Sequence, residues 1–567
     1  MNQESPSDAE HTNDTEEGGG SPRALLMHDN NNNTNTEPRW SLKHMFSCFD
    51  SFLENFRELK RSPRYLIVLY VISFMDSLAY FAFSYALIMH LGVEMGLPDS
   101  LAGIFYGIFG VCISVSTLIL GFVADSMGPR NAMCVSAALS FVARLAMAYA
   151  VLGHATWLSA TLLFAVIAPS MALMAPTIPT AIKRYTTKRT ITIGTSIFYG
   201  IMNGAAFLAT PIIDVLRINN HGNVMLLPPY ALLIALTGIL HIPIFFAALF
   251  GIKDIDLKED YTLGPVAVKA PNRTFMERVK DMTKNRDFWR AVVIVICQIG
   301  VKSSFRYFDA LYLPYVMRAY QDAKTFPYMS LLALNPIIVI ATTVTGAITM
   351  FTDLFHPVTS MIIGAFIGGV APLWMAIGPF VWNILFYVIF TSVGEVIWSP
   401  VSYSFLISLT SDGEEGAWMA LAGMPMFLAK MLTGTLTGTL MAAFCPNPGT
   451  LCKMPPIPNV DGPRGMSPTR FSQETDCVYV NGTLAETPAP APPQLWGDIH
   501  QCYSLGIWGI IGATTSTSFI ALLVVRRYIS NAGREDITEL VELDEFNGEE
   551  DAGDGDGMNT QNIIDDF

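Results

Sequence analysis

The chain has 567 residues, of which 51% are hydrophobic and only 14% are charged, and its mean hydropathy is +0.40. Soluble domains carry about 25% charged residues, and a soluble protein of this composition would expose large apolar patches. The composition therefore predicts a polytopic membrane protein. The formal net charge of -14 gives no information about the ligand, because much of the acid lies in residues 528–567. No basic face in the sequence indicates binding to nucleic acid.

Polar segments flank the apolar part of the chain. Residues 1–45 are low in complexity and follow no charged-then-apolar signal peptide, so we expect a disordered cytoplasmic tail. Residues 46–64 alternate apolar and basic side chains and are expected to lie on the membrane surface. Residues 528–567 are acidic and are expected to be a second disordered tail.

Between these segments, apolar runs of bilayer-crossing length follow one another. The polar and basic segment 252–287 divides six runs from six, which predicts an all-α membrane protein with two six-helix bundles, 65–251 and 288–527. The expected spans are 65–91, 100–124, 130–152, 157–182, 192–215, 228–251, 288–317, 328–351, 358–377, 382–409, 416–444 and 503–527.

Lysine and arginine gather in alternate loops, and such loops are cytoplasmic by the positive-inside rule. This predicts that both termini are cytoplasmic, in the plasma membrane or an endolysosomal membrane. The basic residues on this side, apart from segment 252–287, are Arg57, Lys60, Arg61, Arg64, Arg130, Lys183, Arg184, Lys188, Arg189, Arg526 and Arg527.

The loop 445–502 falls on the opposite side and holds four cysteines in a Pro-rich stretch. That side of a membrane favours disulfides, and four cysteines allow three pairings among which the sequence does not choose. Asn481-Gly482-Thr483 in the same loop is a glycosylation acceptor. The cysteines are Cys445, Cys452, Cys477 and Cys502.

The second and third spans are joined by a Gly-rich turn in which Gly121, Asp125, Gly128 and Arg130 stand out. The glycines let two helices approach closely, Asp125 can cap or accept from a neighbouring helix, and Arg130 holds the inner loop. This stretch resembles the signature of the major facilitator superfamily. The resemblance implies a twelve-helix fold with two bundles in pseudo-twofold arrangement, and a gating role for the motif.

Separate stretches in later spans resemble the proton-coupled oligopeptide transporters. They correspond in order to that family's fifth, seventh, eighth, tenth and eleventh helices. They are Ser196–Ala205, Gln298–Gly300, Leu334–Pro336, Gly394–Glu395 with Ser399–Pro400, and 416–438.

Glu395 lies in the middle of an apolar span, and an ionised group at that depth costs roughly 2.5 kcal/mol or more. Such a group normally faces a partner or a wet cavity, although a purely structural pairing is the alternative. The resemblance implies that Glu395 receives a substrate amino group, while Asn203 and Asn335 hydrogen-bond its backbone or termini. Hydrogen bonding between helices explains both asparagines equally well.

The chain departs from that family in the first and fourth spans. Asp76 stands for one of the family's paired glutamates, and Tyr80 fits one of its aromatic positions, but Ser77 replaces the arginine. Ala175 before Pro176 replaces a lysine. The usual proton-coupling and carboxylate-binding set is broken, which puts di- and tripeptide transport in doubt.

Other charges fall inside the spans, and each needs an acid partner or water. Lys430 and Glu395 lie on neighbouring spans, so they can form a salt bridge that either breaks when substrate binds or is permanent. Lys430 can instead bind a substrate carboxylate, and Arg144 is the other candidate for that role. Arg306 and Asp309 can pair locally. These charges are Arg144, Lys302, Arg306, Asp309 and Lys430.

The sequence thus predicts a secondary transporter of a small organic solute bearing an amine, with Glu395, Asn203, Asn335, Tyr80 and Gln298 at the site and proton coupling through Asp76 or Glu395. There are two alternatives. One is a carrier of organic anions, which is favoured by the excess of cations inside the spans, Lys302 among them. The other is a non-transporting receptor or scaffold. No phosphate loop, catalytic triad or metal spacing indicates an enzyme, a cofactor or a metal. The expected partners are the substrate, protons and the lipid bilayer, for a monomer.

Overall fold

The protein was analysed as a computed structural model. The structure describes Arg57, Leu59, Phe355 and residues 61–187, 190–219, 226–257, 263–265, 283–284, 286–320, 322–344, 357–408, 415–446, 478–480, 483–485 and 502–530. The expectations for the tails 1–45 and 528–567, for most of 46–64 and for Cys452, Cys477 and Asn481 lie largely or wholly outside the described residues.

The first bundle is built from the helices between Arg64 and Gly251. Two of its predicted spans are broken: a π-helical turn, Leu163–Ile167, separates α5 from α6, and Leu240 separates α8 from α9. The helices are α2 (Arg64–Met89), α3 (Asp99–Met127), α4 (Pro129–Ala150), α5 (Thr156–Leu162), α6 (Ala168–Arg184), α7 (Ile191–Asn219), α8 (Pro229–Ile239) and α9 (His241–Gly251).

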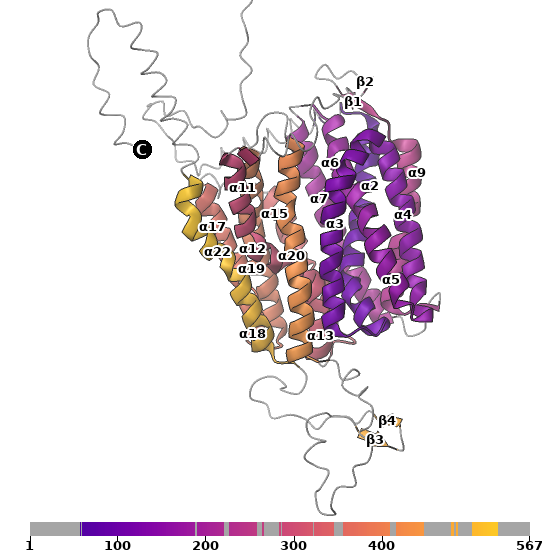
Figure 1. The fold of residues 1–567 in the computed structure, drawn as a ribbon, viewed down its shortest axis with the longest axis vertical. Helices are drawn as coiled ribbons and strands as arrows, with labels where there is room; N and C mark the ends of the chain where they lie inside the picture. Colours follow the sequence, from indigo (N-terminus) through magenta and orange to yellow (C-terminus); the bar gives the residue numbers. More distant parts are fainter. Residues whose placement is uncertain are drawn as a thin grey trace, which may run out of the picture.

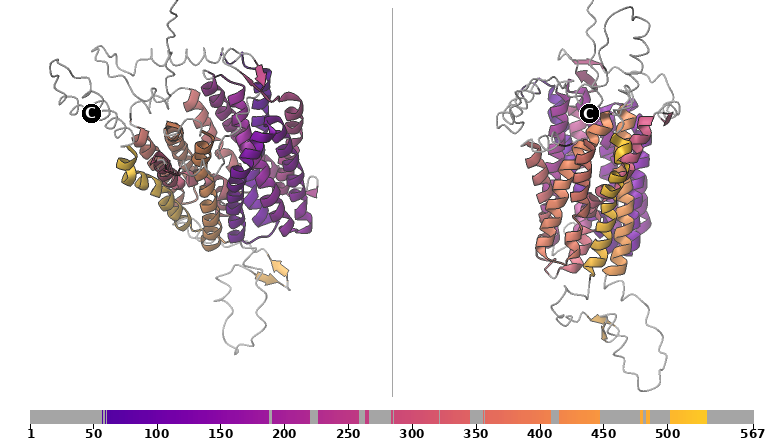
Figure 2. Two further views of the ribbon diagram at one scale, coloured as in Figure 1. Left: turned by 45° about the horizontal axis from the view of Figure 1, so that its top comes forward. Right: turned by 90° about the vertical axis from the view of Figure 1, so that its left-hand side faces the viewer.

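The second bundle contains longer helices and several short ones. Its elements are α11 (Arg286–Cys297), α12 (Ile299–Ala310), α13 (Tyr312–Ala319), α14 (Tyr328–Leu331), α15 (Leu334–Val344), α17 (Pro357–Val370), α18 (Leu373–Ala376), α19 (Val381–Ser408), α20 (Glu415–Phe444) and α22 (Ser504–Ser530). The two bundles stand side by side with their helices roughly parallel (Figures 1 and 2).

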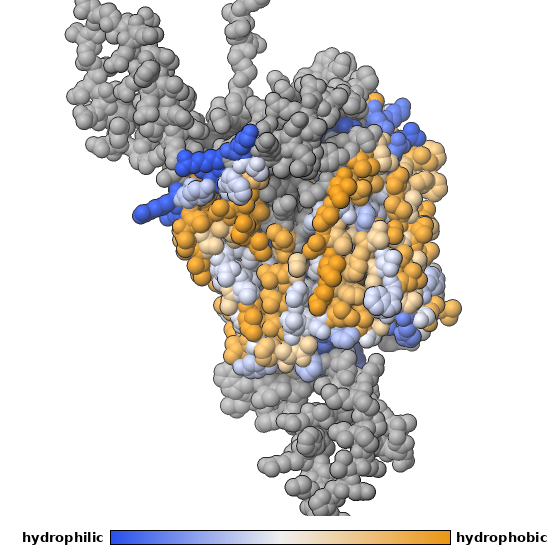
Figure 3. Space-filling model, viewed as in Figure 1, coloured by the Kyte–Doolittle hydropathy of each residue, from blue (hydrophilic) through white to orange (hydrophobic). Residues whose placement is uncertain are grey.

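Helices occupy all twelve predicted ranges. Within the described residues, nine helices are long and apolar enough to cross a membrane, and a tenth span results if α11 and α12, which meet at 46°, count as one. Large apolar side chains such as Phe250 and Val524 are exposed, and Figure 3 shows an apolar band across the visible face of the bundles. Outward apolar side chains of this size and number require lipid rather than water around the helices.

Short strands flank the helical part, which the sequence did not predict. β1 (Ile255–Leu257) pairs antiparallel with β2 (Leu263–Pro265) in the segment between the bundles. β3 (Val478–Val480) pairs with β4 (Thr483–Ala485) in the loop that follows α20. Figure 1 places these hairpins at opposite ends of the molecule.

We name the two ends of the molecule by their residues. The basic face carries Arg64 at the start of α2 and Arg130 at the start of α4. The disulfide face carries the bond between Cys445, after α20, and Cys502, before α22. Of the three cysteine pairings that the sequence left open, this bond corresponds to the one that joins Cys445 to Cys502.

The bundles contact each other closely along α3 and α20. A Cβ atom on Gly103 of α3 would lie 2.3 Å from the carbonyl oxygen of Gly434, and one on Gly434 would lie 2.5 Å from that of Gly103. Gly107 and Gly438 continue the contact toward either side. We call these four residues the glycine seam. Only residues without side chains allow two helix backbones to approach this closely.

Candidate functional site

Glu395 lies on α19, one and a half turns before Pro400, and its side chain is partly exposed in the middle of the molecule. Asn335, at the start of α15, donates its amide N–H to the Glu395 carboxylate at 2.9 Å and to the Ser392 hydroxyl at 3.0 Å. The Tyr199 phenol of α7 is a further hydrogen-bond partner of the carboxylate. The Glu395 carboxylate is therefore held by groups from both bundles.

A second polar cluster lies between α2, α3 and α12. Arg306 pairs with Asp309 at 2.8 Å and donates to the Tyr80 hydroxyl at 3.2 Å. The same Asp309 oxygen accepts from Ser84 at 3.0 Å and from Tyr106 at 3.1 Å. Because Arg306 and Asp309 belong to the second bundle and the hydroxyls to the first, this network also spans the bundle interface.

Lys430 of α20 enters an aromatic cage formed by three side chains of the first bundle. Its Nζ atom lies 4.9, 5.0 and 5.2 Å from the ring centroids of Phe109, Tyr106 and Tyr80, and 3.4 Å from the Tyr80 hydroxyl. Cation–π contacts stabilise an ammonium most when water is excluded. Lys430 is 1% exposed.

A bridge between Lys430 and Glu395, on which two of the three outcomes considered above depend, is absent. Among the residues that the structure describes, the Lys430 ammonium pairs with no carboxylate. The reason is the direction of α20: its Lys430 face packs onto α3, where Gly110 leaves room for the lysine stem. Glu395 faces α15 and α7 instead.

Other residues predicted for the site are buried elsewhere. Gln298 is 1% exposed and hydrogen-bonds Ser402 inside the second bundle. Lys302 is buried with its ammonium 5.5 Å from the Trp398 ring centroid. Asn203 donates to the Tyr199 carbonyl of its own helix at 2.9 Å, one turn from the side chain that reaches Glu395.

Asp76 and Arg144 lie together inside the first bundle, apart from the Glu395 carboxylate. Arg144 donates to the Ala79 carbonyl at 3.0 Å and lies 4.7 Å from the Phe83 ring centroid. The Asp76 carboxylate lies 3.8 Å from Nε2 of His241, at the start of α9.

The turn between α3 and α4 holds the predicted gating motif. Gly128 ends α3 at φ 77°, a left-handed conformation that favours glycine, and the Arg130 amide donates to Asp254 at 3.2 Å. Gly121 lies within α3. The side chain of Asp125 is outside the described part of the structure, so the latch role remains a prediction.

An ion pair and hydrogen bonds join the bundles at the disulfide face. Arg318 of α13 contacts both carboxylate oxygens of Asp99 at 2.7 and 2.9 Å, and also donates to the Cys445 carbonyl at 2.6 Å. Asp214 of α7 pairs with Arg217 at 2.7 Å and accepts from the amide and hydroxyl of Ser330. The bundles are therefore held together at this end.

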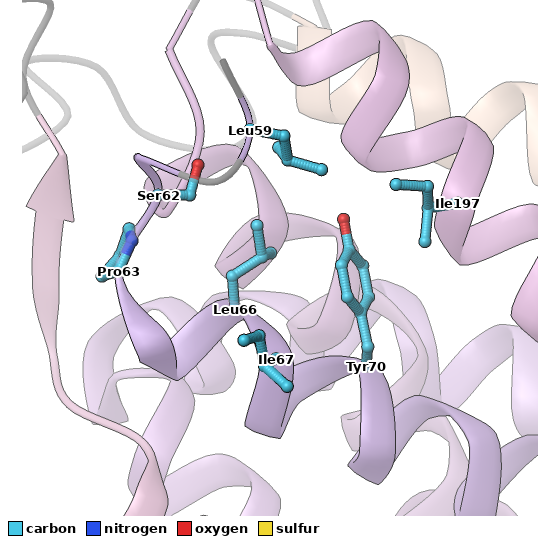
Figure 4. Close-up of a pocket in the computed structure, with 7 residues that line it drawn as sticks. All are labelled: Leu59, Ser62, Pro63, Leu66, Ile67, Tyr70 and Ile197. Atoms are coloured by element: carbon cyan, nitrogen blue, oxygen red, sulfur yellow. The ribbon is translucent and has the colours of Figure 1, made fainter. Parts of the chain in front are cut away.

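A separate hollow of about 250 Å³ opens at the basic face, between the start of α2 and α7 (Figure 4). Its lining is mainly apolar, and its one phenol, Tyr70, donates to the Gly194 carbonyl at 3.0 Å. The hollow therefore offers few groups for binding a polar solute. Its lining residues are Leu59, Ser62, Pro63, Leu66, Ile67, Tyr70 and Ile197.

Sequence reasoning missed several residues of these clusters. Tyr199 lies inside the stretch that resembles the family's fifth helix, so it could have been singled out there. His241 is a lone histidine in an apolar span, which is itself a signal. Tyr106, Ser84 and Arg318 carry no local signal, because their roles depend on which helices meet.

Comparisons with solved structures show the fold. A bacterial homologue of the human drug peptide transporters PepT1 and PepT2 matches at 13% identity and a TM-score of 0.55, covering 82% of this chain and 99% of that one. A POT family transporter in complex with 5-aminolevulinic acid matches at 15% identity and 0.54, covering 83% and 99%. A mutant of the peptide transporter POT in complex with alafosfalin matches at 15% and 0.57, covering 84% and 98%.

No curated protein matches the chain in sequence. The model of the Major Facilitator Superfamily matches residues 69–434, which is more than half of the chain. The family and the fold are those of transporters rather than enzymes. The chain therefore belongs to the Major Facilitator Superfamily and is similar in structure to POT family peptide transporters.

Proposed function

We propose that this transporter moves a small zwitterionic solute, peptide-like or amino-acid-like, by alternating access between its two bundles. The observation that carries the proposal is the partly exposed Glu395 carboxylate, held by Asn335 of one bundle and Tyr199 of the other. A carboxylate at this depth is retained where it meets a cation or water. A substrate ammonium is such a cation, and charge-assisted hydrogen bonds are the stronger ones.

The substrate carboxylate would be received by the cations of the neighbouring cluster. Arg306 lies close enough to Glu395 to act on it electrostatically, and its own acid, Asp309, is already shared with Tyr106 and Ser84. Lys430 has aromatic rings and a hydroxyl around it but no carboxylate among the described residues. A buried ammonium in that state gains from an anionic partner.

The contacts between the bundles support a conformation closed at the disulfide face. The Asp99–Arg318 pair and the glycine seam lie on that side, so release would occur at the basic face. We take the basic face as cytoplasmic by the positive-inside rule, with both termini on that side. The two bundles would rock around the site between them, as in other transporters built from repeats.

A carrier of organic anions is the second candidate. It is favoured by the buried cations Lys302, Arg306 and Lys430, and by the lack of a carboxylate beside Lys430 among the described residues. The two candidates differ in whether the amino group of the solute matters.

The test uses purified protein in lipid vesicles and three matched probes. These are alanyl-alanine, its des-amino analogue propionyl-alanine, and alanyl-alaninamide, which lacks the carboxylate. We expect uptake of alanyl-alanine to exceed that of both analogues. Glu395→Gln should remove the preference over propionyl-alanine, and Lys430→Gln the preference over the amide.

Monodisperse elution of each variant in size-exclusion chromatography controls for folding. Equal uptake of alanyl-alanine and propionyl-alanine by the wild-type protein would favour the anion carrier. A Glu395→Gln variant that still prefers the amine would refute the assignment of Glu395.

A further inference from the structure

The disulfide lies beside the ion pair that joins the two bundles, and the arginine of that pair contacts it. Nη1 of Arg318 donates both to the Cys445 carbonyl at 2.6 Å and to Asp99 at 2.9 Å, while Nη2 donates to Asp99 at 2.7 Å. Arg318 and Cys445 belong to the second bundle, whereas Asp99 begins α3 of the first. The guanidinium is therefore held by a carbonyl of its own bundle while it binds the acid of the other.

The carbonyl that Arg318 contacts belongs to the end of a helix. The Cys445 amide donates to the Met441 carbonyl at 2.9 Å, so Cys445 closes the last turn of α20. Carbonyl groups in the last turn of a helix lack a partner within the helix, and an arginine stabilises them by a hydrogen bond and through the helix dipole. The position of the Arg318 guanidinium thus depends on where α20 ends.

The bond to Cys502 fixes the place where α20 ends. Cys445 is 0% exposed and Cys502 is 8% exposed, and their bond joins the end of α20 to the start of α22. Beside the bond, the Tyr503 amide donates to the Phe444 carbonyl at 2.8 Å. Because the ends of helices fray, a covalent link at this turn keeps the last turn of α20 formed.

The helix that carries Arg318 contacts both of the ends that the disulfide joins. Tyr315 lies one turn before Arg318 on α13, and its hydroxyl is 2.7 Å from that of Ser504 at the start of α22. Its ring also packs edge-on against Trp508 of α22, with the centroids 5.3 Å apart. Arg318 itself contacts the end of α20. If the two ends separate, α13 loses one of its two supports and the guanidinium moves away from its place.

We propose that the bond between Cys445 and Cys502 positions the ion pair: it holds the Arg318 guanidinium where both Asp99 oxygens accept from it, and so keeps the disulfide face closed. This inference rests on the proposed transport function, in which that face opens once in each cycle. Arg318 contacts the acid directly, and the two cysteines act through Arg318. A change in the loop 445–502 that breaks the bond therefore favours opening at this face.

The test compares the same folded protein with the bond formed and broken. In a full-length variant with Cys452→Ser and Cys477→Ser, Cys445 and Cys502 are the remaining cysteines of the loop. The protein in lipid nanodiscs is treated with tris(2-carboxyethyl)phosphine, which with one water converts the disulfide into two thiols and becomes the phosphine oxide. Hydrogen exchange of residues 99–110 is the readout, because they belong to the first bundle, outside the helices that the disulfide joins. We expect reduction to raise the exchange rate there several-fold.

Asp99→Asn in the same background separates the route through Arg318 from a direct effect through the glycine seam. Without the negative charge, the guanidinium loses most of its hold on α3, so we expect reduction to add little further exchange in residues 99–110. Exchange in these residues that stays unchanged when the protein with Asp99 is reduced would overturn the proposal. A rise that is equally large with Asp99→Asn would overturn it as well, because the bond would then act without the ion pair.

Uptake of alanyl-alanine into vesicles by the wild-type protein reports the transport function separately. If no probe is taken up while reduction raises the exchange and Asp99→Asn abolishes that rise, the proposed function fails and the positioning role stands. If the probe is taken up while reduction leaves the exchange unchanged, the positioning role fails and the transport function stands.

Discussion

At the scale of single residues, the two asparagines of the proposed site differ in what they contact. Asn335 bridges Glu395 and Ser392, whereas Asn203 bonds the backbone of its own helix. Both matched the same family pattern in the sequence. Only the Asn335 amide is a direct partner of the carboxylate, so the two residues are expected to contribute unequally to binding.

Replacing Asn335 with alanine should weaken binding of an amino solute more than replacing Asn203. A hydrogen bond to a charged group contributes about 1.5–3 kcal/mol, which corresponds to a roughly 10- to 100-fold loss of affinity. Competition by unlabelled alanyl-alanine against its own labelled uptake would measure the loss. An Asn203→Ala variant that loses as much affinity as Asn335→Ala would contradict this ordering.

The sequence predicted which charges lie at membrane depth but not which way they point. Hydropathy places Glu395, Lys430 and Arg306 along the bilayer normal, because each interrupts an apolar run. Rotation about the helix axis depends on packing, and here Gly110 of α3 decides where Lys430 goes. For that reason the sequence could not decide whether Lys430 and Glu395 form a bridge, and the structure shows that they do not.

At the scale of elements, the glycine seam between α3 and α20 is the closest described contact between the bundles. Its backbones are so near that no side chain fits at Gly103 or Gly434. A seam of this kind allows two helices to slide or rock against each other without side chains that interlock.

Gly103→Ala should destabilise the conformation seen here, since the new methyl group would meet backbone at 2.3 Å. Overpacking of this kind costs about 1–3 kcal/mol, which should lower the midpoint of thermal unfolding by several degrees. Gly204→Ala in α7 is the matched control, because a Cβ there meets nothing within 4 Å. Equal midpoints for the two variants would show that the seam is not closed in solution.

Helix positions were predictable from the length of the apolar runs, and all twelve expected ranges contain helix. The breaks within them were not predicted. The helix interruption at Leu240 brings the His241 ring onto the Thr237 carbonyl. Pro243, which lacks a backbone donor and follows the break within one turn, is the residue that signals it. The β1–β2 hairpin was missed as well, because its strands are only three residues long.

At the scale of the whole molecule, polar contacts between the bundles lie at two levels. One is the mid-depth network around Asp309 and Lys430. The other, at the disulfide face, comprises the Asp99–Arg318 pair and the bonds between Asp214 and Ser330. For the bundles to open at that face, the second level must separate, so the strength of the Asp99–Arg318 pair contributes to the population of the open form.

Asp99→Asn should favour opening at the disulfide face, since it removes the charge that Arg318 contacts through two hydrogen bonds. Each 1.4 kcal/mol lost would change the ratio of the two forms about tenfold. Hydrogen exchange measured by mass spectrometry should rise in residues 99–110 and 434–446. Asp322→Asn is the control, because Asp322 lies at the same face but bonds Tyr328 within its own bundle. Similar exchange in both variants would argue against a role for the pair in closure.

The bond between Cys445 and Cys502 brings their Cα atoms to 4.1 Å and ties the end of α20 to the start of α22. The residues between them thus form a covalent ring attached to the membrane part at a single point. A protease that cuts once inside the ring should leave one particle, which separates into two fragments on a gel only after reduction. The ring is therefore a place where an affinity tag can be inserted without altering the path of any described helix.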